Sequence, residues 1–252
     1  MRTIDLNADA GESFGPWKTG HDEELFPVLS SVNLAAGFHA GDPLTMHRSV
    51  RLAKRYGVAV GAHPGFPDLV GFGRRDMAVT PEQVYADVIY QIGALAGFLR
   101  LEGLRLHHVK PHGALYLQML RNPETARAVA QAVRDYDAEL PLVLLPGTAM
   151  EEAAREVGVR YVREAFPDRA YLADGRLAPR SMEGALVRDP ERTAERAVQM
   201  VLEGRVEALD GGTVAVQADT LCVHGDNPEA VAIARAVRAA LEAHGVKIQT
   251  YA

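Results

Sequence analysis

Cysteine is nearly absent from this sequence, with Cys222 as its single instance among 252 residues. One thiol can form neither an internal disulfide nor a thiolate metal cage, and this usage is typical of proteins in reducing compartments. The sequence also lacks a cationic, apolar N-terminal signal and an apolar run of bilayer-spanning length. We therefore expect a cytoplasmic protein without a membrane partner.

Runs of lysine or arginine are absent as well, and the formal net charge is −6. This balance excludes nucleic acid and anionic membranes as the main partners and favours small-molecule chemistry. Neither G-x-x-x-x-G-K-[ST] nor a G-x-G-x-x-G that opens a helix occurs, so the usual nucleotide-binding loops are missing. If ATP takes part, its site is unconventional or lies on a partner.

Lysine itself is scarce and occurs only at positions 18, 54, 110 and 247. Lys110 lies in the stretch HHVKPHGALY (107–116), where an apolar run ends in a cation, a proline and His112. A buried strand would stay apolar at that point. The stretch is either an ordinary loop or the end of a strand that places Lys110 and His112 in a functional site.

Capped helix starts and short apolar runs alternate along the chain. Five segments begin with a side-chain cap followed by proline, at Asp42-Pro43, Thr80-Pro81, Asn122-Pro123, Asp189-Pro190 and Asn227-Pro228. Candidate strands cover about residues 3–8, 31–36, 58–62, 106–110, 142–145, 160–163 and 213–223. Such alternation predicts βαβ units and a parallel sheet.

The positions of the polar residues in the sequence distinguish between two predicted folds, an open sheet and a closed barrel. They follow nearly every candidate strand, whereas an open sheet gathers them at one switch point. We therefore predict an irregular (β/α) barrel with seven strands. No shift in composition and no long linker marks a second domain, so residues 1–252 are expected to form one domain.

The first strand, TIDLNADAGE, places Asp5, Asn7 and Asp9 on one face by two-residue alternation. Glu12 follows directly. An exposed edge strand with a solvated face would explain this pattern, and so would a catalytic rim, which we favour because three polar groups on one face are costly in a core.

Three histidines follow strands in glycine-rich stretches: His39 in NLAAGFHAGDP, His63 in GAHPGFPDLVGFGRRD, and His112. With carboxylates from the first strand they could ligate a divalent metal that activates water. Metal-free acid/base work by a histidine, with Lys110 holding negative charge, explains them equally well. Arg74 and Arg75 could clamp a carboxylate, or they could be solvated loop residues.

The C-terminal half adds two polar clusters. REAFPDRAY carries Glu164, Asp168 and Arg169, and DTLCVHGDNP carries Cys222, His224 and Asp226. Cys222 is interpreted as a small buried hydrophobe rather than a nucleophile, because no third catalytic group accompanies it. His224 and Asp226 are functional or helix-capping candidates.

Taken in order, DLNADAGESFG, NLAAGFHAGDP, GAHPGFPDLVGFGRRD, YQIGAL, HVKPHGALY, EAFPDRAY and CVHGDN closely resemble the LamB/YcsF family of 5-oxoprolinase A subunits. The resemblance covers essentially the whole chain. That family is similar in fold to the irregular barrels of glycoside hydrolases and polysaccharide deacetylases.

The resemblance implies ATP-dependent opening of the 5-oxo-L-proline lactam to L-glutamate, together with partner subunits B and C. The partners would then supply much of the ATP-dependent activation. Water would be activated by Asp5, Asp9, Glu12, His39, His63 or His112, and Lys110 with Arg74 or Arg75 would hold the substrate carboxylate or a phosphate. The substrate contacts expected at the rim are Asn7, Glu164, Asp168, Arg169, His224 and Asp226.

Two alternatives stay open at this point. The chain could be a metal-dependent amidohydrolase or deacetylase that works alone, which bound stoichiometric metal and activity without ATP would support. It could also be a non-catalytic subunit that presents substrate to its partners, although the many ionisable residues at strand ends argue against this role.

Overall fold

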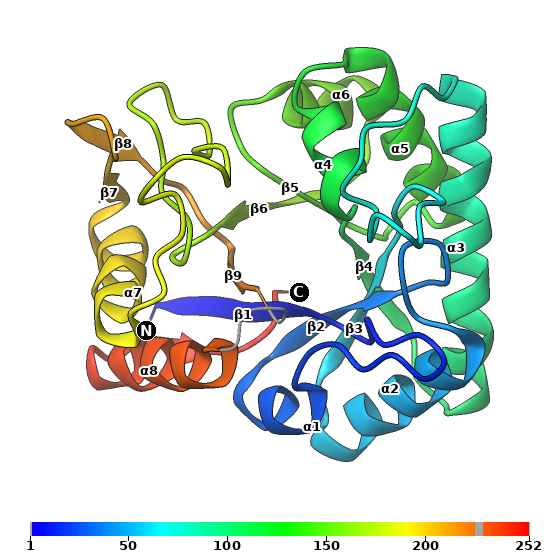
Figure 1. Cartoon of the computed structure of the whole chain (residues 1–252), viewed down its shortest axis with the longest axis horizontal. Helices are drawn as coiled ribbons and strands as arrows, with labels where there is room; N and C mark the ends of the chain where they lie inside the picture. Colours follow the sequence, from blue (N-terminus) through cyan, green and yellow to red (C-terminus); the bar gives the residue numbers. More distant parts are fainter. Residues whose placement is uncertain (1, 225–228, 252) are drawn as a thin grey trace.

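Seven parallel strands pair side by side and close into a barrel, which Figure 1 shows with the helices arranged around it. The strands follow one another in the order β1 (Thr3–Ala10), β2 (Ser31–Ala35), β3 (Ala59–His63), β4 (Leu106–Val109), β5 (Leu142–Leu144), β6 (Tyr161–Ala165) and β9 (Thr220–Val223). β9 then pairs with β1 and completes the ring. This computed structural model describes residues 2–224 and 229–251. The predicted seven-stranded barrel is confirmed.

One predicted strand was wrong in its extent. The apolar run at 213–223 is not continuous: β8 (Thr213–Ala215) pairs with β7 (Arg205–Glu207) as an antiparallel hairpin outside the ring, and only β9 enters the barrel. Asp219 explains the break, because its carboxylate and its backbone N–H both bond Arg163 at the start of the β9 pairing. A short strand, β10 (Lys247–Ile248), extends the sheet beside β1.

The helices begin where the proline signals place them. α2 (Pro43–Tyr56), α3 (Pro81–Leu101), α5 (Pro123–Tyr136) and α7 (Pro190–Val198) all start with a proline after a residue whose side chain accepts from the first turn. The fifth signal, Asn227-Pro228, lies outside the described residues. The other helices are α1 (Asp22–Leu25), α4 (Gly113–Met119), α6 (Ala149–Val157) and α8 (Ala230–Ala243), with a 3-10 turn at Phe26–Val28 and a π-helical turn at Gln199–Glu203.

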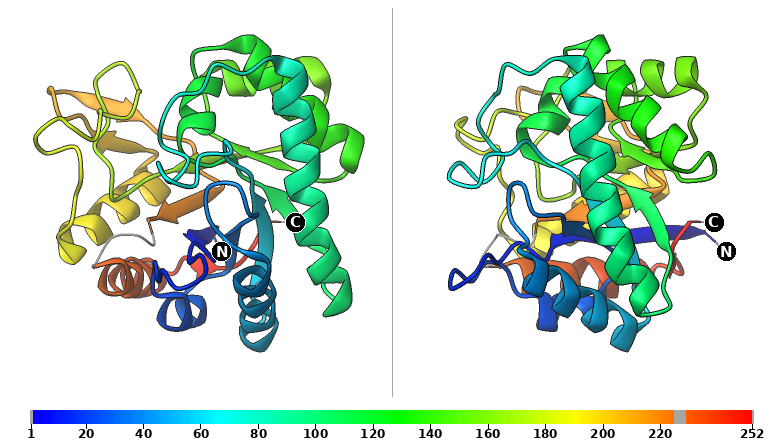
Figure 2. Two further views of the ribbon diagram at one scale, coloured as in Figure 1. Left: turned by 45° about the vertical axis from the view of Figure 1, so that its right-hand side comes forward. Right: turned by 90° about the vertical axis from the view of Figure 1, so that its right-hand side faces the viewer.

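α3 is, by length and composition, long and apolar enough to cross a membrane, contrary to the expectation from the sequence. Its buried residues, among them Val88, Ile92 and Leu95, lie along one face. That face packs on β3 and β4, and α3 also contacts α2 and α5. Figure 2 shows α3 running along one side of the barrel. A covering helix of the barrel explains the same apolar composition.

The inner face of β1 gives the barrel an unusually polar interior. Ile4, Leu6 and Ala8 are buried and join the main hydrophobic cluster, whereas Asp5 and Asn7 are only 1% and 2% exposed. The solvated edge-strand interpretation is therefore excluded, because β1 has strands on both sides and its polar face is enclosed. Such groups must find hydrogen-bond partners inside the barrel.

Candidate active site

The polar residues that follow the strands converge at the carboxyl end of the barrel. Asp9 lies in β1 and Glu12 just beyond it, His39 follows β2, His63 ends β3, and Lys110 and His112 follow β4. Because parallel strands all end on the same side, their terminal residues meet at one mouth. All six residues but Asp9 are buried, and Asp9 is partly exposed.

Asp5 lies in a separate layer toward the other end of β1. Its two carboxylate oxygens accept hydrogen bonds from Ser30 Oγ at 2.7 Å, Ser31 Oγ at 2.8 Å and Thr220 Oγ1 at 2.5 Å. Burial raises the pKa of Asp5, and the three hydroxyl groups offset part of that effect. The carboxylate thus links β1 to β2 and β9 at the base of the barrel.

Asn7 occupies the next layer with a partner that the sequence reasoning missed, Asn33 of β2. Asn33 Nδ2 donates to Asn7 Oδ1 at 2.8 Å and to Asp9 Oδ1 at 2.9 Å, while its own Oδ1 lies 2.6 Å from His108 Nε2. Asn7 Nδ2 donates to Thr220 Oγ1 at 2.6 Å. The available signal was Asn33 itself, a polar residue between the buried Val32 and Leu34.

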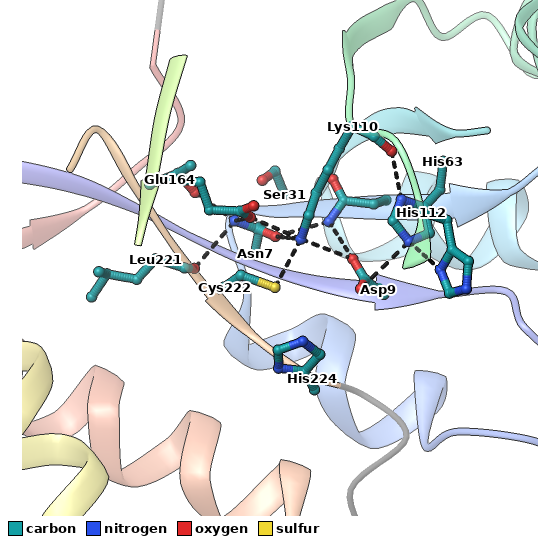
Figure 3. Close-up of polar contacts among 12 residues, drawn as sticks. Asn7, Asp9, Ser31, His63, Lys110, His112, Glu164, Leu221, Cys222 and His224 are labelled. Atoms are coloured by element: carbon teal, nitrogen blue, oxygen red, sulfur yellow. Dashed lines mark hydrogen bonds and ion pairs between the residues drawn. The ribbon is translucent and has the colours of Figure 1, made fainter. Parts of the chain in front are cut away.

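Lys110 reaches into the barrel and meets two acids and a thiol (Figure 3). Its Nζ lies 2.8 Å from Glu164 Oε1, 3.1 Å from Asp9 Oδ1 and 2.9 Å from Cys222 Sγ. Cys222 is buried and free, as the sequence interpretation expected, but it also accepts from Lys110, which that interpretation did not foresee. The single lysine of the stretch 107–116 is therefore the centre of an ion-pair network.

Electrostatics favour the charged forms of Lys110 and Asp9 in this network, but not those of Glu164 and Cys222. Burial by itself lowers the pKa of Lys110, but Asp9, Cys222 and Glu164 outweigh it and hold that pKa well above its usual value. Burial likewise raises the pKa of Asp9, but the neighbouring His63 and Lys110 reverse the effect, so the pKa of Asp9 lies well below its usual value. Burial raises the pKa of Glu164 more than the charge of Lys110 lowers it, so this pKa lies above its usual value. Burial also raises the pKa of the Cys222 thiol well above its usual value.

Three histidines and Glu12 form a second group beside the lysine. Donor atoms of Glu12, His39, His63 and His112 all lie within 4.8 Å of one another. Asp9 connects the two groups, because its Oδ2 lies 3.4 Å from His63 Nε2 while its Oδ1 contacts Lys110. Burial lowers the pKa of His39 and of His112 well below the usual value, with the neighbouring imidazoles adding to the shift.

The loop after β3 covers these rings. A Cβ at Gly65 would lie 2.7 Å from His39 Nδ1, and a Cβ at Gly73, where φ is +62°, would lie 2.7 Å from His39 Cβ. The rings can pack this closely only because both positions are glycine. Phe72 meets the rings of His39 and His112 edge-on, at centroid distances of 5.7 and 5.3 Å.

The two arginines of that loop differ. Arg75 is exposed, and its guanidinium bonds the carboxylate of the buried Asp68, with Nε 3.0 Å from both oxygens. This hydrogen bond from Arg75 lowers the pKa of Asp68 to about 2. Arg74 is also exposed, lies over the Phe72 ring at 5.1 Å, and its charge contributes to the lowered pKa of His39 and His112. Arg75 therefore braces the loop, whereas Arg74 faces the mouth.

Asp168, Arg169 and His224 form a third group after β6 and β9. Asp168 Oδ2 lies 2.8 Å from His224 Nδ1 and accepts the His224 N–H at 3.1 Å. Burial would raise the pKa of Asp168, but His224 lowers it below its usual value. Arg169 donates to Ala178 O at 2.7 Å and is held from behind by Arg196, which donates to Arg169 O at 2.7 Å. Asp226 lies outside the described residues.

A cavity of about 350 Å³ opens beside Glu164, at the ends of β5 and β6. Its wall includes Thr148, Tyr171, Asp174 and Arg176 together with residues 145–147 and 213–216. Glu164 Oε2 is buried and has no hydrogen-bond partner among the described residues, although Oε1 pairs with Lys110. The lysine network therefore has a free acceptor next to a space large enough for a small metabolite.

The profile of the LamB/YcsF family matches residues 4–252. This chain belongs to the LamB/YcsF family. It is 66% identical over 248 residues to the 5-oxoprolinase A subunit of Thermus thermophilus, covering 98% of this chain and 99% of that one. The crystal structure of the lactam utilization protein from the same organism superposes with a TM-score of 0.96 at 65% identity, covering 99% and 100% of the two chains.

More distant structures share only the fold of this family member. The structure of T48 deacetylase with substrate has a TM-score of 0.50 at 16% identity and covers 99% of this chain and 88% of that chain. The expected similarity in fold to deacetylase-type barrels is thereby confirmed.

Proposed function

We propose that this chain is the ring-opening A subunit of an ATP-dependent 5-oxoprolinase that works with subunits B and C. Its family and the name of its 66% identical relative support the assignment. The observation that carries the catalytic part is the juxtaposition of Lys110 and a buried Glu-His group at the barrel mouth, joined by Asp9. A positive charge stands beside bases that could activate water.

Coupling to ATP would overcome the resistance of the lactam ring to hydrolysis. A lactam is a resonance-stabilised amide with a poor leaving group, so the γ-phosphoryl group of ATP is transferred to the lactam oxygen first. Water then adds to the activated carbon, the C–N bond breaks and the nitrogen takes a proton. A second water hydrolyses the resulting acyl phosphate, which leaves L-glutamate, ADP and phosphate.

Lys110 is assigned the role of stabilising the negative charge that develops on oxygen during these reaction steps. It is held rigidly by Glu164, Asp9 and Cys222, and a fixed cation in a buried site stabilises such charge more than one in water. The group of His63, His112 and Glu12 would orient and deprotonate the attacking water. Asp5, whose oxygens are occupied by three hydroxyl groups, is assigned to the barrel base instead.

The substrate would lie between the mouth and the cavity beside Glu164. Glu164 Oε2 and the buried Arg169 Nε have no hydrogen-bond partners among the described residues and are placed to accept and to donate. Arg74 would attract the substrate carboxylate or the phosphate. The described part of the chain has no nucleotide loop, which agrees with ATP being bound mainly by the partner subunits.

The test is glutamate release from 5-oxo-L-proline by the assembled complex, by this chain alone and without ATP. We expect turnover only in the complete mixture, and its absence there would overturn the proposal. Lys110→Ala and His112→Ala should each reduce turnover on the order of 100-fold or more, as for a lost electrostatic or acid/base group. His244→Gln, at an exposed histidine on the far end of α8, is the matched control and should leave turnover unchanged.

The same experiment separates the two rival functions. Release of product without ATP and partners would favour a stand-alone amidohydrolase. Nearly intact turnover in both alanine variants would favour a subunit that only presents the substrate.

A further inference from the structure

The group of Glu12, His39, His63 and His112 has features that acid/base chemistry alone does not require. All four side chains are buried, and they come from four separate segments of the chain that meet at the barrel mouth. One donor atom of each lies within 4.8 Å of the others. Bringing three imidazoles and a carboxylate out of water is costly unless something satisfies them.

The tautomers of His63 and His112 are determined by backbone carbonyls. His63 Nδ1 lies 2.6 Å from Lys110 O, and His112 Nε2 lies 2.8 Å from Phe72 O. Since a carbonyl oxygen only accepts, each of these nitrogens must carry the hydrogen. The other nitrogens, His63 Nε2 and His112 Nδ1, therefore point into the site, where His63 Nε2 also lies 3.4 Å from Asp9 Oδ2.

Those two nitrogens lie only 2.9 Å apart, as the dashed line between the rings in Figure 3 marks. When both rings are neutral, their lone pairs repel each other at this distance unless a positive species, either a proton or a metal ion, lies between or beside them. Metal-binding histidines are oriented in this way, with the second ring nitrogen donating to a carbonyl or carboxylate.

His39 supplies an independent observation. It is fully buried, and neither of its ring nitrogens makes a hydrogen bond among the described residues. Its ring stacks on His112 with a centroid distance of 3.7 Å and an interplanar angle of 1°, and its Nε2 lies 3.3 Å from Glu12 Oε1. Because one ion cannot lie in the planes of two parallel rings, His39 has to turn out of this stack to share an ion with His112. A buried imidazole without a hydrogen bond costs free energy, which a bound ligand would offset.

Three of the separations are close to those around a single ion. Ligands about 2.1 Å from a tetrahedral metal lie about 3.4 Å from one another. The three are 2.9 Å for His63 and His112, 3.3 Å for His39 and Glu12, and 3.5 Å for His112 Nδ1 and Glu12 Oε1, and all four donor atoms lie within 4.8 Å of one another. We propose that Glu12, His39, His63 and His112 bind one divalent transition-metal ion. Three imidazoles with one carboxylate suit Zn²⁺, Fe²⁺, Mn²⁺ or Co²⁺, and not Mg²⁺ or Ca²⁺.

This inference deepens the proposed ring-opening site but is independent of ATP and of the partners. Asp9 joins His63 to Lys110. Such an ion would supply Lewis acidity to the attacking water, and the four residues would then hold the ion instead of taking the proton of the water themselves. Its failure and the failure of the proposed function are distinguishable, because metal binding is measured on the chain alone and ring opening on the complex.

The experiment uses protein purified without a histidine tag and stripped with a chelator. Titration with Zn²⁺ followed by calorimetry should give one site per chain, and Co²⁺ should produce visible absorption bands of a nitrogen-ligated site. The double variant His63→Gln/His112→Gln should bind at least about 100-fold more weakly, beyond the 10–100-fold loss expected for an outer contact. His244→Gln should match the parent chain.

A second measurement covers the case in which the double variant does not fold. Crystals of the unaltered chain soaked in Zn²⁺ should give an anomalous scattering peak among the four side chains. A peak only elsewhere on the surface, or no titratable site in the stripped chain, would overturn the proposal and leave a proton as the species shared by His63 and His112.

Discussion

Lys110 Nζ lies 2.8 Å from Glu164 Oε1, and both side chains are buried inside the barrel. A buried ion pair is not by itself a source of stability, but removing one partner leaves the other charge without compensation. We expect Lys110→Met to lower the free energy of unfolding by about 3–5 kcal/mol, because Glu164 and Asp9 then lack their cation. Urea unfolding at neutral pH measures the change.

A double-mutant cycle isolates the pair. Glu164→Gln should cost about 1–3 kcal/mol, since Asp9 still faces Lys110. The double variant Lys110→Met/Glu164→Gln should then be less destabilised than the sum of the two by at least about 1 kcal/mol. Strict additivity would show that the two groups do not interact.

The N-cap of α2 predicts a pH dependence. The Thr45 hydroxyl donates to Asp42 Oδ2 at 2.6 Å and, with backbone N–H groups, lowers the pKa of Asp42 to about 2. Because the unfolded value is roughly 3.9, the contribution of Asp42 is complete above that value and is lost as pH falls through 2. Asp42→Ala should cost about 0.5–2 kcal/mol at neutral pH, and the difference from the parent chain should narrow between about pH 4 and pH 2.

Thr45→Val is the control for this cap, because it removes the hydroxyl donor and keeps the carboxylate. It should weaken the pH dependence without abolishing the cap. A difference between Asp42→Ala and the parent chain that is constant over the whole acid range would contradict the assignment.

Gly73 and Gly57 form a matched pair for testing how tightly the histidine rings are packed. Both have positive φ, +62° and +66°, but a Cβ at Gly57 meets nothing within 4 Å. Gly57→Ala should therefore cost only the backbone strain, about 1–2 kcal/mol. Gly73→Ala should cost about 1–3 kcal/mol more, because the methyl group collides with His39. Equal thermal midpoints for the two variants would refute the tight packing.

The neighbouring arginines should separate binding from stability. Arg74→Ala should raise KM for 5-oxo-L-proline about tenfold, the loss of one charge-assisted contact, with little change in thermal midpoint. Arg75→Ala should leave KM unchanged and lower stability by about 1–3 kcal/mol, because the buried carboxylate of Asp68 loses its cation although the guanidinium itself is exposed. A raised KM for Arg75→Ala and a lowered stability for Arg74→Ala would instead assign binding to Arg75 and loop stability to Arg74. KM is measured on the complex, and the thermal unfolding midpoint is measured on the free chain.

Local sequence patterns predict much of the fold of this protein. Proline after a capping side chain predicts the start of α2, α3, α5 and α7, because cap and proline act within one turn. The alternation in TIDLNADAGE predicts which side chains of β1 share a face. Polar residues after each strand then favour a closed ring, since the ends of parallel strands lie on one side.

Other features depend on distant parts of the chain. The division of 213–223 into β8 and β9 follows from Asp219 meeting Arg163, which are 56 positions apart. The distinction between Arg74 and Arg75 follows from where Asp68 lies, and no local pattern contains it. Local patterns did not single out Asn33 and predicted Cys222 to be a small buried hydrophobe, because their partners, Asn7 and Lys110, come from other strands or follow them.

The sequence by itself determined the barrel class, the family and most of the polar residues inside the barrel and at its mouth, because these depend on residue type and short-range order. Only the tertiary structure decided how that set divides: Asp5 in a layer closed by hydroxyl groups, Lys110 in an ion-pair network, and His39, His63 and His112 around Glu12. The physical reason is that charge, tautomer and metal affinity depend on distances of a few ångströms between residues that the chain brings together only on folding.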